Sequence, residues 1–204
     1  MVNIVVATIF MLRYFFGLIF FPYKTMRSIV KEKDFLQIII IFCVVYSYFV
    51  IANIIRRHTF HPFIISSSSL VSFAFFIISF ILVTVFFYAV GKVTKHPTGY
   101  RPLIFSFVFS LFPTLIWFFT TSLLFFLLPP PRTVSFFGQI FSFFFVAFSL
   151  TLLSWRIVLL YLSVRFSMKT DFYNTMFYIL LFFLWFIPYS YLMYYLRFFR
   201  IPLI

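Results

Sequence analysis

Five long apolar runs divide this chain, and short polar or proline-rich stretches separate them. A helix needs about 20 apolar residues to cross the hydrocarbon core of a bilayer, and each run meets that length. Phe, Ile and Val favour strands in water, but in lipid every backbone polar group must be paired within its own segment, so helices are expected. The predicted spans cover residues 35–55, 63–90, 103–128, 134–164 and 172–196.

The stretches between the runs contain residues that end helices. Residues 56–62 hold two arginines and close with a proline, and residues 91–102 hold two glycines, two prolines and three basic residues. Residues 129–131 are three consecutive prolines, which cannot continue a helix. The sequence therefore predicts an all-α fold, a polytopic transmembrane helical bundle whose five-helix domain covers residues 35–204.

The amino-terminal segment, residues 1–34, has two possible arrangements. Residues 4–21 are apolar apart from Arg13 and would form a helix about 27 Å long. This helix either spans the membrane, giving six spans, or lies in the interface with Arg13 reaching water. The favoured arrangement is an interfacial amphipathic helix, with five spanning helices after it.

A basic stretch follows Pro22 and is the candidate contact with lipid head groups or with a partner. Its cations are Lys24, Arg27, Lys31 and Lys33. The first three follow helical spacing, so their side chains share one face. We expect that face to contact anionic head groups.

Composition supports a membrane protein and changes how the charge is interpreted. The 204 residues are 65% hydrophobic and 9% charged, against about 25% charged residues in a soluble domain. The net charge of +13 would suggest nucleic acid in a soluble protein. Here the basic residues lie between apolar runs, where they set membrane orientation, so no nucleic acid is expected.

The distribution of basic residues predicts a cytoplasmic amino terminus. With five spans, ten basic residues fall on the amino-terminal side: Arg13, Lys24, Arg27, Lys31, Lys33, Lys92, Lys95, Arg101, Arg165 and Lys169. Five fall on the other side: Arg56, Arg57, Arg132, Arg197 and Arg200. Because cytoplasmic loops carry the excess of Lys and Arg, the first group is assigned to the cytoplasm.

Residues for catalysis or metal binding are sparse. The acids are Glu32, Asp34 and Asp171, and the histidines are His58, His61 and His96; all are predicted in loops. His58 and His61 are three residues apart, but no acid or cysteine stands nearby to complete a metal site. The single cysteine, Cys43, allows no intrachain disulfide, and four glycines do not make a phosphate-binding loop. We therefore expect no catalytic residues, cofactor, metal or nucleotide.

Arg156 is the one charge that could lie inside a span. If its helix ends near Trp155, the favoured alternative, Arg156 is an interface anchor; if the helix continues to Val164, it is buried at a cost. Pro113 and Pro188 are expected to kink their spans. Small residues are frequent in the second and fourth spans and are interpreted as helix-packing positions, with a polar pathway as the alternative: Ser66 to Ser69, Ser72, Ser79, Gly138 and Ser142.

The order of several short motifs resembles the Yip domain family, multi-pass proteins that interact with Ypt and Rab GTPases. The motifs are FPYKTMR at 21–27, YAVGK at 88–92, SFVFSLFP at 106–113, and WR at 155–156 followed by YLSVRFS at 161–167. The resemblance implies five helices and a cytoplasmic amino terminus. Eukaryotic members act between endoplasmic reticulum and Golgi and carry a long soluble amino-terminal region. This chain is more similar to the short bacterial members, which implies a bacterial cytoplasmic membrane rather than a eukaryotic endomembrane.

The expected function is therefore non-enzymatic: a multi-pass membrane protein that organises membrane partners or lipids. Its expected partners are the bilayer, anionic head groups, and other membrane proteins or further copies of itself. The alternative is a small transporter, scramblase or insertase-like protein, with Arg156 and the serines of the second span lining a polar groove.

Overall fold

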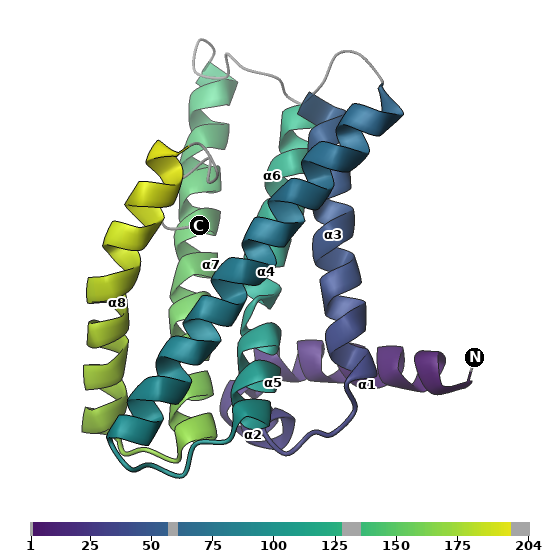
Figure 1. Ribbon diagram of the computed structural model, residues 1–204. Helices are drawn as coiled ribbons and strands as arrows, with labels where there is room; N and C mark the ends of the chain where they lie inside the picture. Colours follow the sequence, from purple (N-terminus) through teal and green to yellow (C-terminus); the bar gives the residue numbers. More distant parts are fainter. Residues whose placement is uncertain (1, 57–60, 128–135, 197–204) are drawn as a thin grey trace.

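The computed structural model describes residues 2–56, 61–127 and 136–196. Over these ranges all the regular secondary structure is helical (Figure 1). The eight helices are α1 (Val2–Phe20), α2 (Pro22–Ile29), α3 (Leu36–Arg56), α4 (Pro62–Val93), α5 (Tyr100–Ser110), α6 (Phe112–Leu127), α7 (Phe136–Met168) and α8 (Phe172–Tyr195).

Five candidate spans are present, which confirms the predicted fold class. Four are the single helices α3, α4, α7 and α8, and the fifth is formed by α5 and α6 together. Their bounds agree with the predicted runs to within a few residues, because the apolar length of each run fixes where a helix can leave the membrane. The largest difference is at the end of α7, which continues to Met168.

The helix α1 does not cross the bundle lengthwise. It lies crosswise at the end where α2, α3 and α5 begin, as Figure 1 shows. Its apolar part, Ile4–Phe20, is shorter than the five spans. The structure thus has the arrangement with five spans and a separate amino-terminal helix, and not the alternative with six spans.

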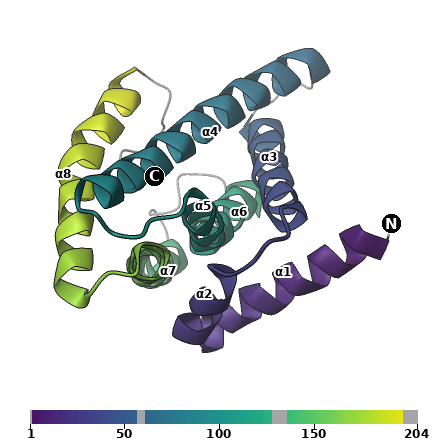
Figure 2. The same cartoon turned by 60° about the horizontal axis from the view of Figure 1, so that its bottom comes forward.

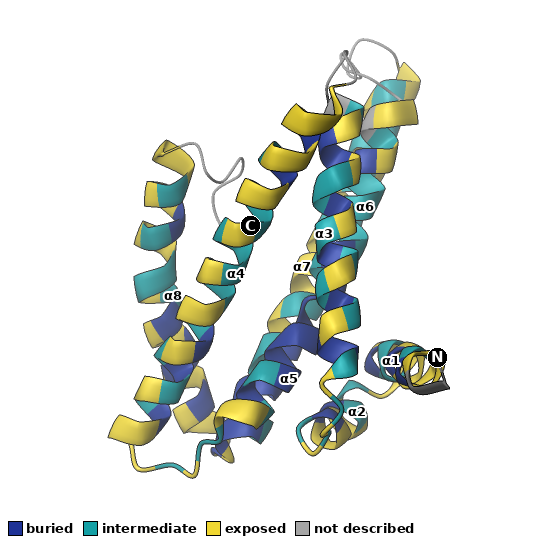
Figure 3. Ribbon diagram, turned by 45° about the vertical axis from the view of Figure 1, so that its right-hand side comes forward, coloured by how far each residue is buried: buried dark blue, intermediate teal, exposed yellow. Residues whose placement is uncertain are grey.

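The α5 helix occupies the centre of the molecule, and the other helices surround it (Figure 2). In the span built from α5 and α6, 61% of the most apolar window is buried, against 11% for α4 and α7. Figure 3 shows the same contrast, with a dark α5 among helices whose outer surfaces are exposed. Those outer surfaces are apolar, as expected where a protein faces acyl chains.

Two apolar cores meet at α5. The first joins α1, α2, α3, α6 and α7 to one side of α5, and its fully buried residues include Met26, Phe105 and Phe109. The second joins α4, α7 and α8 to the other side, around Phe87 and Phe107. A helix that contributes to both cores is buried on opposite sides, and residues 105–110 of α5 are all buried.

Small polar residues lie where helices approach one another. The Ser163 hydroxyl of α7 donates to the Ser106 carbonyl of α5 at 3.1 Å, and the Trp117 indole of α6 donates to Ser149 of α7 at 2.9 Å. Asn53 of α3 donates to Ser69 of α4 at 3.0 Å. Ser69 therefore has the packing role expected for serines of the second span, because small side chains let helices come close.

The two intramembrane prolines differ in effect. Pro113 lies in the first turn of α6, just after a break at Leu111, whose N–H bonds three residues back to Val108 at 3.2 Å. Proline has no N–H to give to the Phe109 carbonyl, so the α-helical ladder cannot run through this point. Pro188 lies inside α8, which stays one continuous helix. The span that contains Pro113 is thus divided into two helices, whereas the span that contains Pro188 is a single helix.

Candidate lipid-contact site

The short helix α2 carries the basic residues named above. Pro22 stands at its first position, where the missing N–H costs nothing. Met26 and Ile29 are fully buried, and Met26 contacts Ser163 of α7, with 3.8 Å between hydroxyl oxygen and sulfur. Lys24 and Arg27 are exposed on the other side. The alternation of these residues therefore fixes a cationic face away from the bundle.

Lys31 and Lys33 follow α2 and are also exposed. The connections 30–35, 94–99 and 169–171 all lie at this same end of the bundle (Figure 1). They bring Lys95 and Lys169, both exposed, to the same end. Most cations assigned to the amino-terminal side thus gather there, whereas the side chains assigned to the far side lie outside the described part of the chain.

Three cations at this end pack on aromatic rings, and the Arg101 guanidinium lies 4.8 Å from the centre of the Phe35 ring. The Lys92 ammonium lies 5.2 Å from the centre of the Tyr88 ring. The Arg165 guanidinium lies 6.0 Å from the Tyr23 ring and donates to the Tyr161 hydroxyl at 2.9 Å. Such cation–π contacts suit a membrane interface, where the ring is apolar and the cation stays near water.

The α1 helix packs one stripe of residues on the bundle. Met11 and Leu18 are buried, the Tyr14 ring meets Phe109 edge-on at 5.6 Å, and Phe15 meets Phe112 at 5.1 Å. The rest of the helix surface remains exposed and is mostly apolar: Ile9, Leu12, Phe16, Ile19 and Phe20. Arg13 is the exposed cation of α1. A helix apolar on its outer side lies at the boundary between head groups and acyl chains.

Gly17 brings α1 and α2 into close contact. A Cβ atom at position 17 would lie 2.6 Å from the Thr25 hydroxyl oxygen, closer than real Cβ atoms come to their neighbours. Glycine is therefore required for α2 to fold back against α1 at this distance. We refer to α1, α2 and residues 30–35 together as the amino-terminal platform.

The acid Glu32 holds the platform together. The Tyr14 hydroxyl donates to Glu32 Oε2 at 2.7 Å, and the N–H groups of Lys33 and Asp34 donate to Oε1 at 2.8 and 3.3 Å. Arg101 of α5 donates to the Lys33 carbonyl. Spacing along the sequence gave no sign of these contacts, because Tyr14 and Glu32 are 18 residues apart.

These contacts shift two pKa values. Burial alone would raise the pKa of Glu32, but hydrogen bonds from Tyr14 and from the Lys33 and Asp34 N–H groups outweigh it and lower the pKa. Burial and the neighbouring carboxylate raise the pKa of Tyr14 to about 12. The carboxylate–phenol pair is thus the stable form across the neutral range.

We expect Tyr14→Phe to loosen α1 from the bundle. The lost hydrogen bond to a charged group is worth about 1.5 kcal/mol at a partly exposed site. Its loss should raise the equilibrium constant for the release of α1 from the bundle roughly tenfold. Hydrogen–deuterium exchange over residues 2–20 measures this opening. Tyr23→Phe removes a hydroxyl from the same platform without breaking the bond to Glu32, so exchange in that control should match the unaltered protein.

The difference in hydrogen–deuterium exchange over residues 2–20 between Tyr14→Phe and the unaltered protein should depend on pH. A carboxyl with a lowered pKa stabilises the fold above its unfolded pKa, and the contribution is lost as pH falls through the lowered, folded value. A phenol with a raised pKa stabilises the fold below pH 10, the ordinary tyrosine value, and the contribution is lost as pH rises toward 12. An exchange difference that stays constant from neutral to acidic pH would contradict this account.

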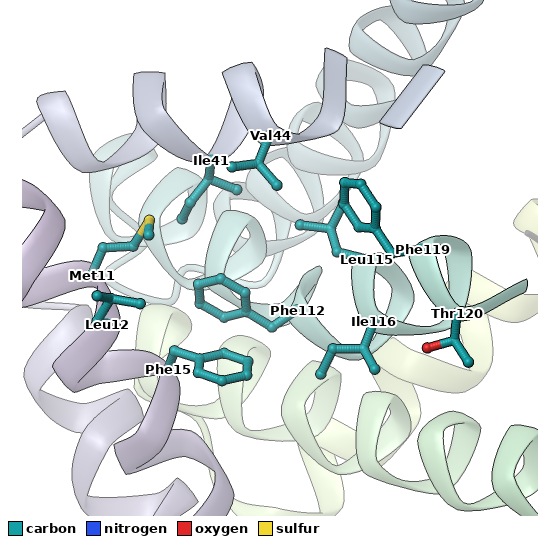
Figure 4. A pocket seen from close by; sticks show the side chains of 10 residues that line it. All are labelled: Met11, Leu12, Phe15, Ile41, Val44, Phe112, Leu115, Ile116, Phe119 and Thr120. Atoms are coloured by element: carbon teal, nitrogen blue, oxygen red, sulfur yellow. The ribbon is translucent and has the colours of Figure 1, made fainter. Parts of the chain in front are cut away.

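An apolar groove opens between α1, α3 and α6, with a volume of about 390 Å³. In Figure 4, α1 side chains face those of α3 and α6 across it. Its lining is Met11, Leu12, Phe15, Ile41, Val44, Phe112, Leu115, Ile116, Phe119 and Thr120. The volume falls in the range of roughly 300–1,000 Å³ that is usual for small-molecule sites. With one hydroxyl among ten side chains, the groove suits a hydrocarbon chain.

The remaining candidate residues are not brought together. The His96 ring meets the Tyr178 ring edge-on, with 6.1 Å between ring centres. His61 is exposed at the start of α4, and His58 lies outside the described residues. In the described part of the chain, no three His, Cys, Asp or Glu side chains are grouped as metal ligands. Asp34 accepts from the Leu36 N–H at 3.0 Å and caps α3.

Arg156 lies inside α7, 12 residues before its last residue, Met168. That spacing is about 18 Å along the helix. The favoured prediction that the helix ends near Trp155 is therefore wrong, because apolar residues continue beyond Arg156 and keep the segment helical. Arg156 is half-buried.

The fold and this surface define a multi-pass membrane protein. No known protein family, curated protein sequence or solved structure matches the chain. The resemblance to the Yip domain family therefore stays a prediction.

Proposed function

We propose that this protein is a non-enzymatic membrane protein that organises anionic lipids at its amino-terminal platform. The observation that carries the proposal is the exposed cationic face of α2, fixed by the burial of Met26 and Ile29. The face belongs to the end of the molecule at which α1 offers an apolar outer surface to lipid. A head group and its acyl chains would thus find complementary surfaces on one platform.

Electrostatics supports anionic lipid in particular. Each Lys or Arg near an anionic membrane surface contributes about 1 kcal/mol to attraction. Lys24, Arg27, Lys31 and Lys33 are all exposed, and within the described residues none of them forms an ion pair with Glu32 or Asp34. The groove between α1, α3 and α6 then receives an acyl chain of the bound lipid.

The orientation and the family belong to the same proposal. The excess of basic residues at the platform end assigns that end to the cytoplasm, where anionic lipids give the surface a negative potential. The motif FPYKTMR at 21–27 builds the turn into α2 and most of that helix. A Yip-like protein of a bacterial cytoplasmic membrane, which also contacts other membrane proteins or copies of itself, is the particular identity we propose.

The test replaces Lys24, Arg27, Lys31 and Lys33 together by Gln. The matched control exchanges Lys for Arg and Arg for Lys at the same four positions, which keeps the charge. Native mass spectrometry of the purified protein from nanodiscs containing phosphatidylglycerol and phosphatidylcholine counts the retained anionic lipids. We expect at least a tenfold loss of phosphatidylglycerol retention in the neutralised variant alone, and a steep dependence on salt in the unaltered protein.

Equal retention by the neutralised variant and the control would mean that the basic residues only set topology, and the proposal would fail. The placement of Arg156 favours a second candidate function, movement of lipid or solute across the membrane. Transfer of a fluorescent phospholipid between leaflets of vesicles by the unaltered protein would support that second function.

A further inference from the structure

The face of α7 that contains Arg156 points into the bundle. Ser149 and Ser163 lie seven residues before and after Arg156, which is close to two full helical turns, so all three share one face. Leu152 and Leu159 on this stripe are buried, whereas Ile157 and Val158 beside it are exposed. Arg156 is therefore a cation on the inward stripe of a membrane-spanning helix.

The register between helices places Arg156 opposite the break in the central span. Ser149 accepts a hydrogen bond from Trp117 of α6, and Ser163 donates to the Ser106 carbonyl of α5. Arg156 stands midway between these two contacts on α7. On the facing segment, α5 and α6, the position midway in sequence between Ser106 and Trp117 is near Leu111, where α5 ends and α6 begins.

The break supplies groups that bind negative charge. The α6 helix starts at Phe112, so the N–H groups of its first turn and the positive end of its dipole lie at this level. Thr114 lies three residues before Trp117 and so on the same face, toward α7. Its hydroxyl oxygen is buried and has no hydrogen-bond partner in the described residues.

Among the described residues, Arg156 has no partner that balances its charge. Within the described part of the chain it forms no hydrogen bond, ion pair or cation–π contact, whereas Arg165, two and a half turns along the same helix, bonds Tyr161. A cation within a span normally pairs with protein or faces water. A half-buried arginine, an unpartnered hydroxyl and a helix start near one level are thus groups that suit a bound anion.

We propose that Arg156, Thr114 and the first turn of α6 form an intramembrane site for a phosphate oxyanion. A guanidinium holds phosphate oxygens through two parallel hydrogen bonds, the Thr114 hydroxyl donates a further one, and a helix start is favourable for such a group. Broken helices bind anionic groups in this way in membrane transporters. The oxyanion belongs to a phospholipid head group or to a free phosphate.

The position of α1 shows how a lipid phosphate comes to this depth. Phe15 of α1 contacts Phe112, the first residue of α6, with 5.1 Å between ring centres, so a side chain of α1 reaches the break. Helices that lie in the membrane plane sit at the boundary of head groups and acyl chains. The Phe15 side chain thus connects that boundary to the level of Arg156.

The experiment measures thermal unfolding of the full chain in detergent, in a background with Lys24, Arg27, Lys31 and Lys33 neutralised so that the platform does not contribute. Sodium phosphate and a short-chain phosphatidylglycerol are titrated separately, against chloride at equal ionic strength. We compare the apparent affinity for whichever of the two anions stabilises the background protein. Arg156→Gln should lower that affinity at least tenfold, and Thr114→Val should lower it several-fold. Lys95→Gln removes an exposed cation that lies outside the platform and serves as the control, with no expected change.

Stabilisation by both anions identifies a site open to free phosphate, and stabilisation by phosphatidylglycerol alone identifies a head-group site; either result supports the proposal. Absence of stabilisation in the background protein, or equal stabilisation with Arg156→Gln, overturns it. If Arg156→Gln does not fold, Arg156→Lys decides: it keeps the charge but loses the two-bond geometry, so undiminished affinity in Arg156→Lys and in Thr114→Val overturns the proposal as well.

Discussion

Ser163→Leu is expected to abolish the folded bundle. Ser163 is fully buried, and its hydroxyl touches three elements: the Leu159 carbonyl within α7 at 2.7 Å, the Ser106 carbonyl of α5 at 3.1 Å and Met26 of α2 at 3.8 Å. A leucine there must separate α7 from α5 and α2. Overpacking of a tight contact costs about 3 kcal/mol or more, a large part of the stability of a domain of this size.

The measurement is the fraction of detergent-extracted protein that elutes as a single symmetric peak in size-exclusion chromatography. Ser163→Ala keeps the small volume and loses one interhelical hydrogen bond, worth about 0.6 kcal/mol in membrane proteins, so it should elute normally. Ser154→Leu makes the same substitution on the exposed side of α7 and should also be tolerated. Normal elution of Ser163→Leu would show that α5 and α7 do not pack as described.

Single-cysteine labelling is expected to give an all-or-none result for topology. Cys43→Ala removes the native thiol, and Lys31→Cys then places a thiol at the platform end and Tyr195→Cys one at the end of α8. An odd number of spans separates these positions, so a reagent that does not cross the membrane should label one of them from each side. Positive residues at the platform assign Lys31→Cys to the cytoplasmic side.

Val93→Cys, at the exposed end of α4, should follow Lys31→Cys, because two spans lie between them. Phe63→Cys, at the other end of the same helix, should follow Tyr195→Cys. Reaction of positions 63 and 93 from the same side would contradict a spanning α4 and the five-span arrangement with it.

The number and type of spans follow from the sequence, because one physical requirement controls them. A backbone in lipid must pair with itself, and about 20 apolar residues are needed to cross. The runs predicted at 63–90 and 172–196 therefore reappear as α4, Pro62–Val93, and α8, Phe172–Tyr195. The bounds of these two helices do not depend on which other helices they pack against.

The assembly of the platform did not follow from the sequence. The bond between Tyr14 and Glu32, and that between Arg101 and the Lys33 carbonyl, join segments distant along the chain, and no periodicity records such a pairing. The same limit applies to Arg156. The sequence left open whether the helix ends near Trp155 or continues to Val164, and the face that Arg156 presents depends on the contacts of Ser149 and Ser163 with two other segments.

The burial of Met26 against Ser163 also sets an order of assembly during synthesis. The two residues are 137 positions apart, and α7 leaves the ribosome long after α2. Since chains emerge amino terminus first, α1 and α2 reach the membrane surface before the surface on which they pack exists. The α1 helix can pack on α3, α5 and α6 as these helices insert, but the contact between Met26 and Ser163 forms only after the fourth span, α7, inserts.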